Sequence, residues 1–173
     1  MKRLFFLASA LLSLLTAQAQ TVTEYAVREA ATVREPLVCD SADIKGNRYK
    51  ADLLKTDVVV SPDAFPSDIV TTDTTGMLTL PGREGENILY IVTTRLRAER
   101  FMKADLKITG TLPFDASVEG LGKATKPESQ DSISPQSSRT ISLRMEPEKT
   151  YPVTLKVLVP SDGKGDFCIK CEV

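Results

Sequence analysis

The chain has 173 residues, with 22 Lys and Arg against 23 Asp and Glu, and it contains neither histidine nor tryptophan. Because histidine is the usual general base near neutral pH, a Ser-His-Asp or Cys-His catalytic site cannot be built from this chain alone. The densest charge cluster, residues 95–103, carries both signs, so nucleic acid is not an expected partner. We therefore expect a non-catalytic protein with no cofactor and no metal.

Residues 1–19 have the order of a secretory signal peptide. Lys2 and Arg3 precede an apolar run that ends at Leu15, and residues 17–19, Ala-Gln-Ala, supply the small residues of a cleavage site. The apolar run is too short to span a bilayer, so no transmembrane anchor is expected. Cleavage before Gln20 removes two of the 22 basic residues and leaves a net charge of about −3. The predicted location is exported: the periplasm, the outer cell surface or the medium.

Residues 20–55 are predicted to form an N-terminal arm that packs on the main domain. Residues 24–31, EYAVREAA, and residues 49–55, YKADLLK, contain good helix formers. Each segment is expected to form a helix of one or two turns or to remain irregular, and the first is alternatively an extended arm.

Residues 56–173 are predicted to form the main domain, because apolar and polar residues alternate along it with the period of half-buried strands. The alternation is clearest in residues 103–109, 140–145 and 151–159, while 56–60 and 76–80 are shorter strands. Residues 86–94 are apolar at consecutive positions, which predicts a central strand covered on both faces. Short strands with no crossover helices predict an all-β fold, an antiparallel β-sandwich of jelly-roll or immunoglobulin-like type.

Three segments between the strands carry turn or loop signals. Residues 114–124 are interpreted as a strand-turn-strand with Gly120 and Gly122 available for positive φ. Residues 126–139, KPESQDSISPQSSR, are rich in serine and predict a flexible loop. Residues 161–166, SDGKGD, are interpreted as a hairpin turn between the strand ending at Val159 and the next one, because Lys164 stands where a calcium loop needs an oxygen ligand.

The final residues 165–173, GDFCIKCEV, predict a strand rather than a metal or redox site. Along a strand Cys168 and Cys171 are about 10 Å apart and face opposite sides, so they cannot pair with each other. A zinc site needs more ligands than Cys39 can add. Cys171 is expected to be a core residue and Cys168 to be more exposed. A Cys39–Cys171 disulfide is the preferred pairing, with Cys39–Cys168 and three free thiols as alternatives.

The segment ADLKITGTLPFDASVEGLGKATK, a serine-rich insert, and SRTISLRMEPEKTYPVTLKVLV resemble the β-sandwich that precedes the propeller in secreted bacterial prolyl-oligopeptidase-like proteins. More generally they resemble jelly-roll accessory domains of exported hydrolases. The resemblance covers about half of the chain that follows the signal peptide. It implies a non-catalytic role, because the nucleophile of such enzymes lies in a separate α/β-hydrolase domain and this chain has no G-x-S-x-G sequence.

Two sets of residues are candidate sites. Tyr25, Tyr49 and Tyr90 are candidates for stacking on a sugar ring, with burial in the strands or arm as the alternative. Three tripeptides resemble an O-glycosylation sequon used on exported proteins by some Gram-negative bacteria, with ordinary turn chemistry as the alternative. Their acceptor residues are Ser41, Thr74 and Ser132.

These features predict a secreted or periplasmic β-sandwich module that binds a glycan or a cell-envelope protein. One alternative is a structural or assembly subunit that adds a strand to a partner sheet. Another is an accessory domain of an exported hydrolase. An enzyme using serine-lysine or carboxylate chemistry would need a polar cleft with convergent titratable groups.

Overall fold

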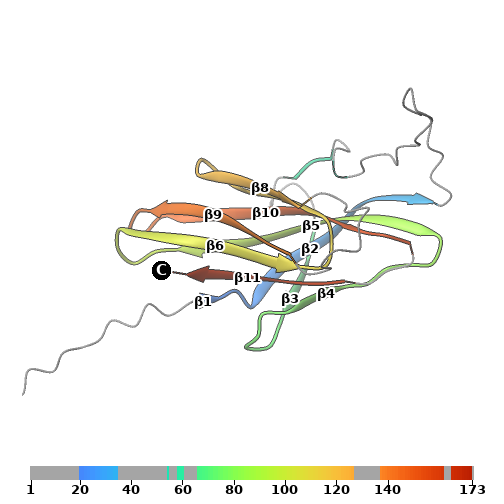
Figure 1. Cartoon of the computed structure of the whole chain (residues 1–173), viewed down its shortest axis with the longest axis horizontal. Coiled ribbons are helices and arrows are strands. Elements are labelled where there is room, and N and C mark those ends of the chain that lie inside the picture. Colours follow the sequence, from blue (N-terminus) through green and yellow to red (C-terminus); the bar gives the residue numbers. More distant parts are fainter. Residues whose placement is uncertain are drawn as a thin grey trace, which may run out of the picture.

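A computed structural model of the chain describes residues 20–34, 54, 58–60, 66–126, 137–161 and 165–172, and it shows two packed β-sheets (Figure 1). The six-stranded sheet has the order β3-β2-β5-β10-β7-β8. The five-stranded sheet has the order β1-β11-β6-β9, with β4 also paired to β11. The strands are β1 Gln20–Thr21, β2 Glu24–Arg34, β3 Asp68–Thr71, β4 Leu78–Leu80, β5 Glu86–Arg97, β6 Met102–Gly110, β7 Phe114–Val118, β8 Gly122–Lys126, β9 Ser137–Met145, β10 Thr150–Val159 and β11 Gly165–Glu172. The prediction of an all-β antiparallel sandwich is confirmed.

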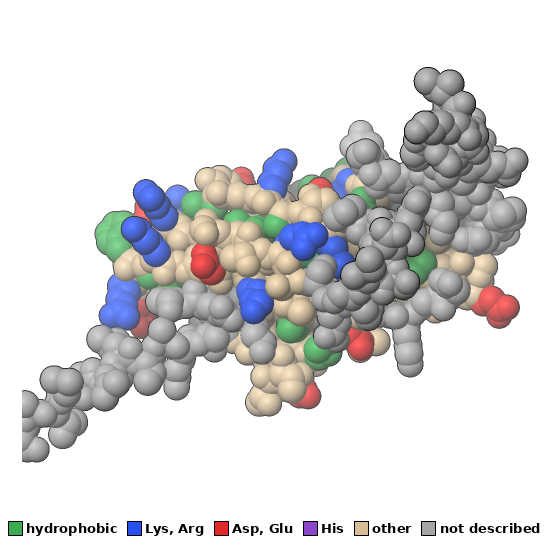
Figure 2. All heavy atoms as spheres, viewed as in Figure 1, with side chains coloured by type: hydrophobic (Ala, Val, Ile, Leu, Met, Phe, Trp, Pro, Cys, Tyr) green, Lys and Arg blue, Asp and Glu red, His purple; other side chains and the backbone are tan. Residues whose placement is uncertain are grey.

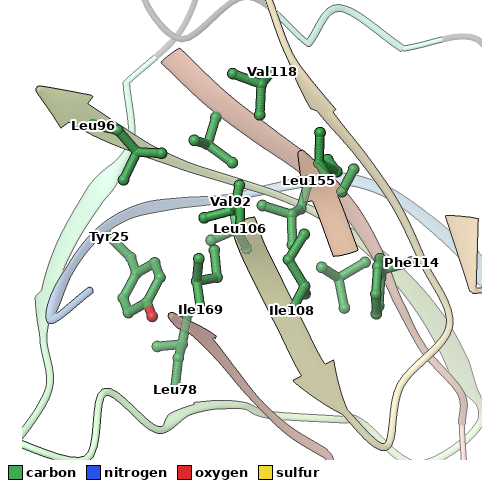
Figure 3. Close-up of a cluster of buried hydrophobic side chains, with 14 of the residues drawn as sticks. Tyr25, Leu78, Val92, Leu96, Leu106, Ile108, Phe114, Val118, Leu155 and Ile169 are labelled. Carbon is green, nitrogen blue, oxygen red and sulfur yellow. The ribbon is translucent and has the colours of Figure 1, made fainter. Parts of the chain in front are cut away.

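The main core lies between the two sheets because the strands alternate in the way the sequence predicts. In β10, Tyr151, Val153, Leu155 and Val157 are buried while the residues between them are half-buried. Figure 3 shows Val92 and Leu155 of the six-stranded sheet meeting Leu106 of the five-stranded sheet. Burial of such side chains stabilises the fold by about 1.5–3 kcal/mol each, so this interface is the chief source of stability.

The central strand β5 is buried on both faces, as its continuous apolar run predicts. Ile88 and Val92 belong to the main core, whereas Leu89 belongs to a smaller apolar cluster with Leu54 and Leu158. Lys156 donates a hydrogen bond from Nζ to the carbonyl of Leu54 at 3.1 Å. Residue 54 therefore lies over the six-stranded sheet on the side away from the main core.

Residues 20–34, which the sequence predicted as an arm on the sandwich, form β1 and β2 of its two sheets. Of the two interpretations of residues 24–31, the helix is wrong and the extended conformation is correct, because β2 lies between β3 and β5 and pairs with both. Tyr25 and Val27 are buried on its inner face, so tertiary packing overrides the helix propensity of the alanines and charged residues. The other expected helix, residues 49–55, lies outside the described residues except for Leu54.

Two further expectations about strands and loops need correction. Residues 58–60 are described but form no strand, and Val59 is 53 % exposed. The flexible loop expected over 126–139 is shorter at both ends, because Lys126 completes β8 and residues 137–139 begin β9. Residues 127–136 lie outside the described residues.

The turns between strands fit the prediction only in part. Gly120 has φ 72° and lies in the turn of the β7–β8 hairpin, as expected. Gly122 does not adopt positive φ, and a Cβ there would lie 2.7 Å from Ile141 Cγ2, so its glycine allows β8 to approach β9. The segment at Ser161 is not a hairpin, because β10 and β11 belong to different sheets and the chain crosses the sandwich between them.

Candidate functional site

Two of the three tyrosines predicted to stack on a sugar lie in the core. Tyr25 has no exposed surface and Tyr90 is 8 % exposed. The Tyr90 hydroxyl donates to the carbonyl of Pro81 at 3.0 Å. Neither ring presents a free face, which corrects the expectation for both residues. Tyr49 lies outside the described residues.

Tyr25 instead connects the residue that follows β1 to the segment that precedes β4, close to β11. Its hydroxyl lies 3.0 Å from the carbonyl oxygen of Val22 and 3.1 Å from that of Gly76, and its single proton is shared between them. Desolvation by burial raises the pKa of Tyr25 to about 12, despite a backbone hydrogen bond with Ile169 that lowers it. Figure 3 shows this ring beside Leu78 and Ile169 at one side of the core. Tyr25 is therefore a structural residue with a satisfied polar end.

The cysteine predictions are only partly covered by the described residues. Residues 165–172 form β11, as expected, and Ile169 is fully buried. Cys168 is a free thiol among the described residues and is only 8 % exposed, so it is buried although the sequence predicted a more exposed side chain. Cys39 and the side chain of Cys171 lie outside the described part, and the Cys39–Cys171 disulfide stays a prediction.

Among the predicted O-glycosylation residues, only Thr74 is described. It lies exposed in the turn between β3 and β4. The preceding Asp73 accepts hydrogen bonds at Oδ1 from the Thr75 backbone N–H at 2.9 Å and from its hydroxyl at 2.5 Å. These bonds lower the pKa of Asp73 and are ordinary turn chemistry, and O-glycosylation of Thr74 stays a prediction. Ser41 and Ser132 lie outside the described residues.

The end of the sandwich formed by residues 95–103 and 144–149, called the cationic end below, is the candidate site that sequence reasoning missed. It joins β5 to β6 and β9 to β10, and it holds six basic residues against three acidic ones. Figure 2 shows Lys and Arg side chains bordering hydrophobic ones at this end, where β6 begins in Figure 1. The charged residues are Arg95, Arg97, Glu99, Arg100, Lys103, Arg144, Glu146, Glu148 and Lys149.

The two connections of the cationic end are tied to each other. Ala98 and Pro147 form an isolated bridge, and the Glu148 N–H donates to the Ala98 carbonyl at 2.9 Å. Glu148 adopts φ 62°, the left-handed region that costs a non-glycine residue about 1–2 kcal/mol, and its carboxylate pairs with Arg97. The ordered turn therefore fixes where the neighbouring charges lie.

An open depression of about 810 Å³ lies on the cationic end. It is lined by Arg97, Ala98, Glu99, Arg100, Met102 and Glu148. Beside it, Phe101 is 75 % exposed. Arginine remains protonated and acts as a hydrogen-bond donor, so these side chains are suited to binding anionic groups rather than to transferring protons.

Lys103 and Arg144 are directly opposite each other on β6 and β9, and both are exposed on the outer face of their sheet. Like charges in this position destabilise an antiparallel pair. In the part of the chain that the structure describes, neither side chain makes a salt bridge or hydrogen bond. The cationic end therefore concentrates positive charge that the described residues do not neutralise.

Lys126 is a buried cation with a structural role, in contrast to these exposed ones. It is 7 % exposed, and its Nζ donates to the carbonyls of Gly110 at 3.0 Å and Thr111 at 2.7 Å. Burial lowers the pKa of Lys126, with a smaller contribution from Arg139. The side chain ties β8 of one sheet to the β6–β7 connection.

The described residues contain no group of three or more Cys, Asp or Glu side chains placed to hold a metal ion. In the same residues, no helix is long and apolar enough to cross a membrane.

Comparisons with known proteins assign no family to the chain. No family model matches it, and no curated protein matches it. One similar solved structure is the beta-glucosidase from Kluyveromyces marxianus in complex with glucose, with a TM-score of 0.47 and 12 % sequence identity. The likeness covers 63 % of this chain and 14 % of the enzyme, so this chain matches only a small part of that protein.

Proposed function

We propose that the protein is an exported, non-catalytic β-sandwich module of the bacterial cell envelope that binds a glycan or a cell-envelope protein. The observation that carries the proposal is the exposure of Phe101 beside unpaired cations on one ordered end of the sandwich. Exposed aromatic and arginine side chains are the residue types that contribute most to binding energy at interfaces. The signal-peptide pattern of residues 1–19 supports export.

Binding is favoured over catalysis by the chemistry of the cationic end. An enzyme without histidine would need a nucleophile next to a base of suitable pKa, such as a serine beside a lysine. The depression is lined instead by arginines and by Glu148, which is paired with Arg97. These groups hold a ligand by charge and hydrogen bonds and offer no proton acceptor free of an ion pair except Glu99.

The test is a glycan-array screen together with photo-crosslinking from position 101 in cells that export the protein. We expect wild-type protein to retain a glycan on the array or to crosslink to one envelope protein through position 101. Phe101→Ala should weaken glycan retention at least about tenfold, which corresponds to loss of one buried aromatic side chain. Ile69→Ala is the matched control, because Ile69 is 66 % exposed but lies on β3. Binding lost equally in both variants, or no ligand in either experiment, would contradict the proposal.

Export is tested separately by recovering the protein from periplasmic and extracellular fractions and sequencing its N-terminus. A mature chain that begins at Gln20 is the expected result. Protein that stays in the cytoplasm with Met1 intact would contradict export and leave the binding test unaffected.

A second candidate is an assembly subunit that adds a strand to a partner sheet. In the described residues β3 pairs on one side only, with β2, and its Ile69 is 66 % exposed. An unpaired edge of this kind accepts another strand through backbone hydrogen bonds. Replacing Ile69 by proline would block such pairing, and a partner interaction that survives Ile69→Pro would rule out strand addition at β3. The role as an accessory domain of an exported hydrolase rests on the sequence resemblance and predicts copurification with a hydrolase.

A further inference from the structure

Phe101 is the most exposed of the large hydrophobic side chains that the structure describes, at 75 %. It lies between the last residue of β5 and the first residue of β6, in the connection at one end of the elongated sandwich (Figure 1). Exposing this much of an aromatic ring to water is unfavourable in free energy, and the exposed ring adds no stability to the folded chain. The position is therefore suited to inserting the ring into an apolar surface that belongs to another assembly.

Cations flank this ring in the sequence, and the register of β6 and β9 adds a third. Arg100 precedes it, and Lys103 follows it at the start of β6, directly opposite Arg144 of β9. None of the three makes an ion pair with a described residue, whereas Glu146 and Glu148 are paired with Lys149 and Arg97. Of the three acidic residues at this end, Glu99 alone remains to offset them. A ring with unpaired cations on each side presents an apolar tip within a positive field.

We infer that the cationic end docks on an anionic lipid surface, with Phe101 inserted at the level of the headgroups and Arg100, Lys103 and Arg144 held against lipid phosphates. This goes beyond the proposed recognition of a glycan or an envelope protein. The chain as a whole has a net charge of −1, so the positive end also orients the molecule toward a negative surface. A peripheral contact of this kind needs no membrane-spanning segment.

The geometry favours a lipid surface over the other anionic partners. A stable protein interface buries about 800 Å² on each partner, so a protein partner would have to contact more of the surface than the one exposed aromatic side chain of the cationic end. A sugar stacked on the Phe101 ring would take its hydrogen bonds from the surrounding side chains, because phenylalanine carries no polar group of its own. The three cations come from a connection and two different strands, an arrangement that matches a diffuse layer of phosphates better than one fixed anion.

The experiment is co-sedimentation of the full chain, recovered from cells that export it, with large unilamellar vesicles. One set contains phosphatidylcholine alone, and the other contains equal parts of phosphatidylcholine and phosphatidylglycerol. We expect binding to the anionic vesicles, little binding to the neutral ones, and weaker binding as salt is raised, because exposed charges are screened. Arg100→Gln, Lys103→Gln and Arg144→Gln should each lower the partition coefficient about fivefold. Phe101→Ala should lower it about tenfold.

Matched variants separate a specific docking end from general adhesion. Lys107→Gln changes a partly exposed lysine further along β6, and Ile69→Ala removes an exposed apolar side chain from β3. Both should bind like wild type. Equal losses in these controls, binding to neutral vesicles as strong as to anionic ones, or retention by polygalacturonate or an acidic protein without vesicle binding would each overturn the inference. A result from the glycan array neither supports nor contradicts it.

Discussion

The interior around Tyr25 and the cationic end around Phe101 follow opposite rules. In the interior, the polar group of a buried ring is satisfied by the carbonyls of Val22 and Gly76, and no buried side-chain nitrogen or oxygen among the described residues lacks a partner. At the cationic end, a ring is left in water and two like charges face each other across β6 and β9. The first arrangement serves folding stability, and the second costs stability. Features that cost stability and persist on an ordered turn point to binding.

The largest expected difference between the two regions comes from removing one phenylalanine from each. Phe114 is 1 % exposed in the main core, and Phe114→Ala should lower the free energy of unfolding by about 3–5 kcal/mol. Phe101→Ala should change it by less than about 0.5 kcal/mol, because the ring is exposed. Urea unfolding followed by circular dichroism measures both. A large loss in Phe101→Ala would mean that the ring packs against the fold, which would remove the contrast.

A second test disturbs the close packing of Gly76 against residues 21 and 22, next to the hydrogen bonds of Tyr25. A Cβ on Gly76, at φ 68°, would overlap the Thr21 side chain and the Val22 carbonyl. Gly76→Ala should therefore destabilise by about 2–4 kcal/mol, combining left-handed strain with displacement of β1. Gly85→Ala is the matched control, because Gly85 has φ 73° with nothing within 4 Å of the added atom, and it should lose only about 1 kcal/mol. Similar losses in both variants would show that the close approach to β1 is unimportant.

A third test uses pH to isolate the Tyr25 hydroxyl. Tyr25→Phe should lower the free energy of unfolding by about 1–2 kcal/mol at neutral pH, because two carbonyls lose a shared donor. The pKa of Tyr25 in the fold is about 12, above the ordinary 10.0, so the neutral form is favoured by folding. Its stabilising contribution is complete below pH 10 and is lost as pH rises toward 12. Wild type should therefore lose stability in that window more steeply than Tyr25→Phe, and equal slopes would assign the alkaline loss to other groups.

The smallest expected effect is a gain in stability when one of the opposed charges at the cationic end is removed. Lys103→Gln removes one of two opposed positive charges, so it should raise the free energy of unfolding by about 0.2–1 kcal/mol at low salt. The gain should shrink as salt is added. Lys123→Gln is the control, because the exposed Lys123 of the edge strand β8 is opposite Ser117 of β7 and has no like charge across the pair. A loss of stability in Lys103→Gln would show that Lys103 already has a compensating partner.

The sequence predicted the strands whose side chains alternate without ambiguity. Residues 103–109 and 151–159 show period-two alternation, and the structure places them in β6 and β10. The sequence does not predict β2 uniquely, because the residues EYAVREAA favour a helix locally and only pairing with β3 and β5 decides their conformation. Val58 to Val60 have the composition of a strand but form none, because propensity does not supply a partner.

The candidate site was harder to predict than the fold for a specific physical reason. Residues 95–103 were visible as a cluster of mixed charge, but the sequence cannot show which charges are paired across strands. The opposition of Lys103 and Arg144 depends on the register of β6 and β9, which are separated by two other strands along the chain. The sequence cannot distinguish an exposed Tyr25 or Tyr90 from a buried one, because tyrosine tolerates either environment, and both are buried.

The position of β11 has a consequence for how the protein forms. β11 lies at the centre of the five-stranded sheet and pairs with β1, β4 and β6, so residues 20–21 meet residues 170–171. These contacts span nearly the whole described chain, and pairings of such long sequence separation slow folding. During synthesis, β1 and β4 have no sheet to join until residues 165–172 emerge. The five-stranded sheet therefore assembles late, and a chain crossing a membrane in an extended state would not be trapped by premature folding of this sheet.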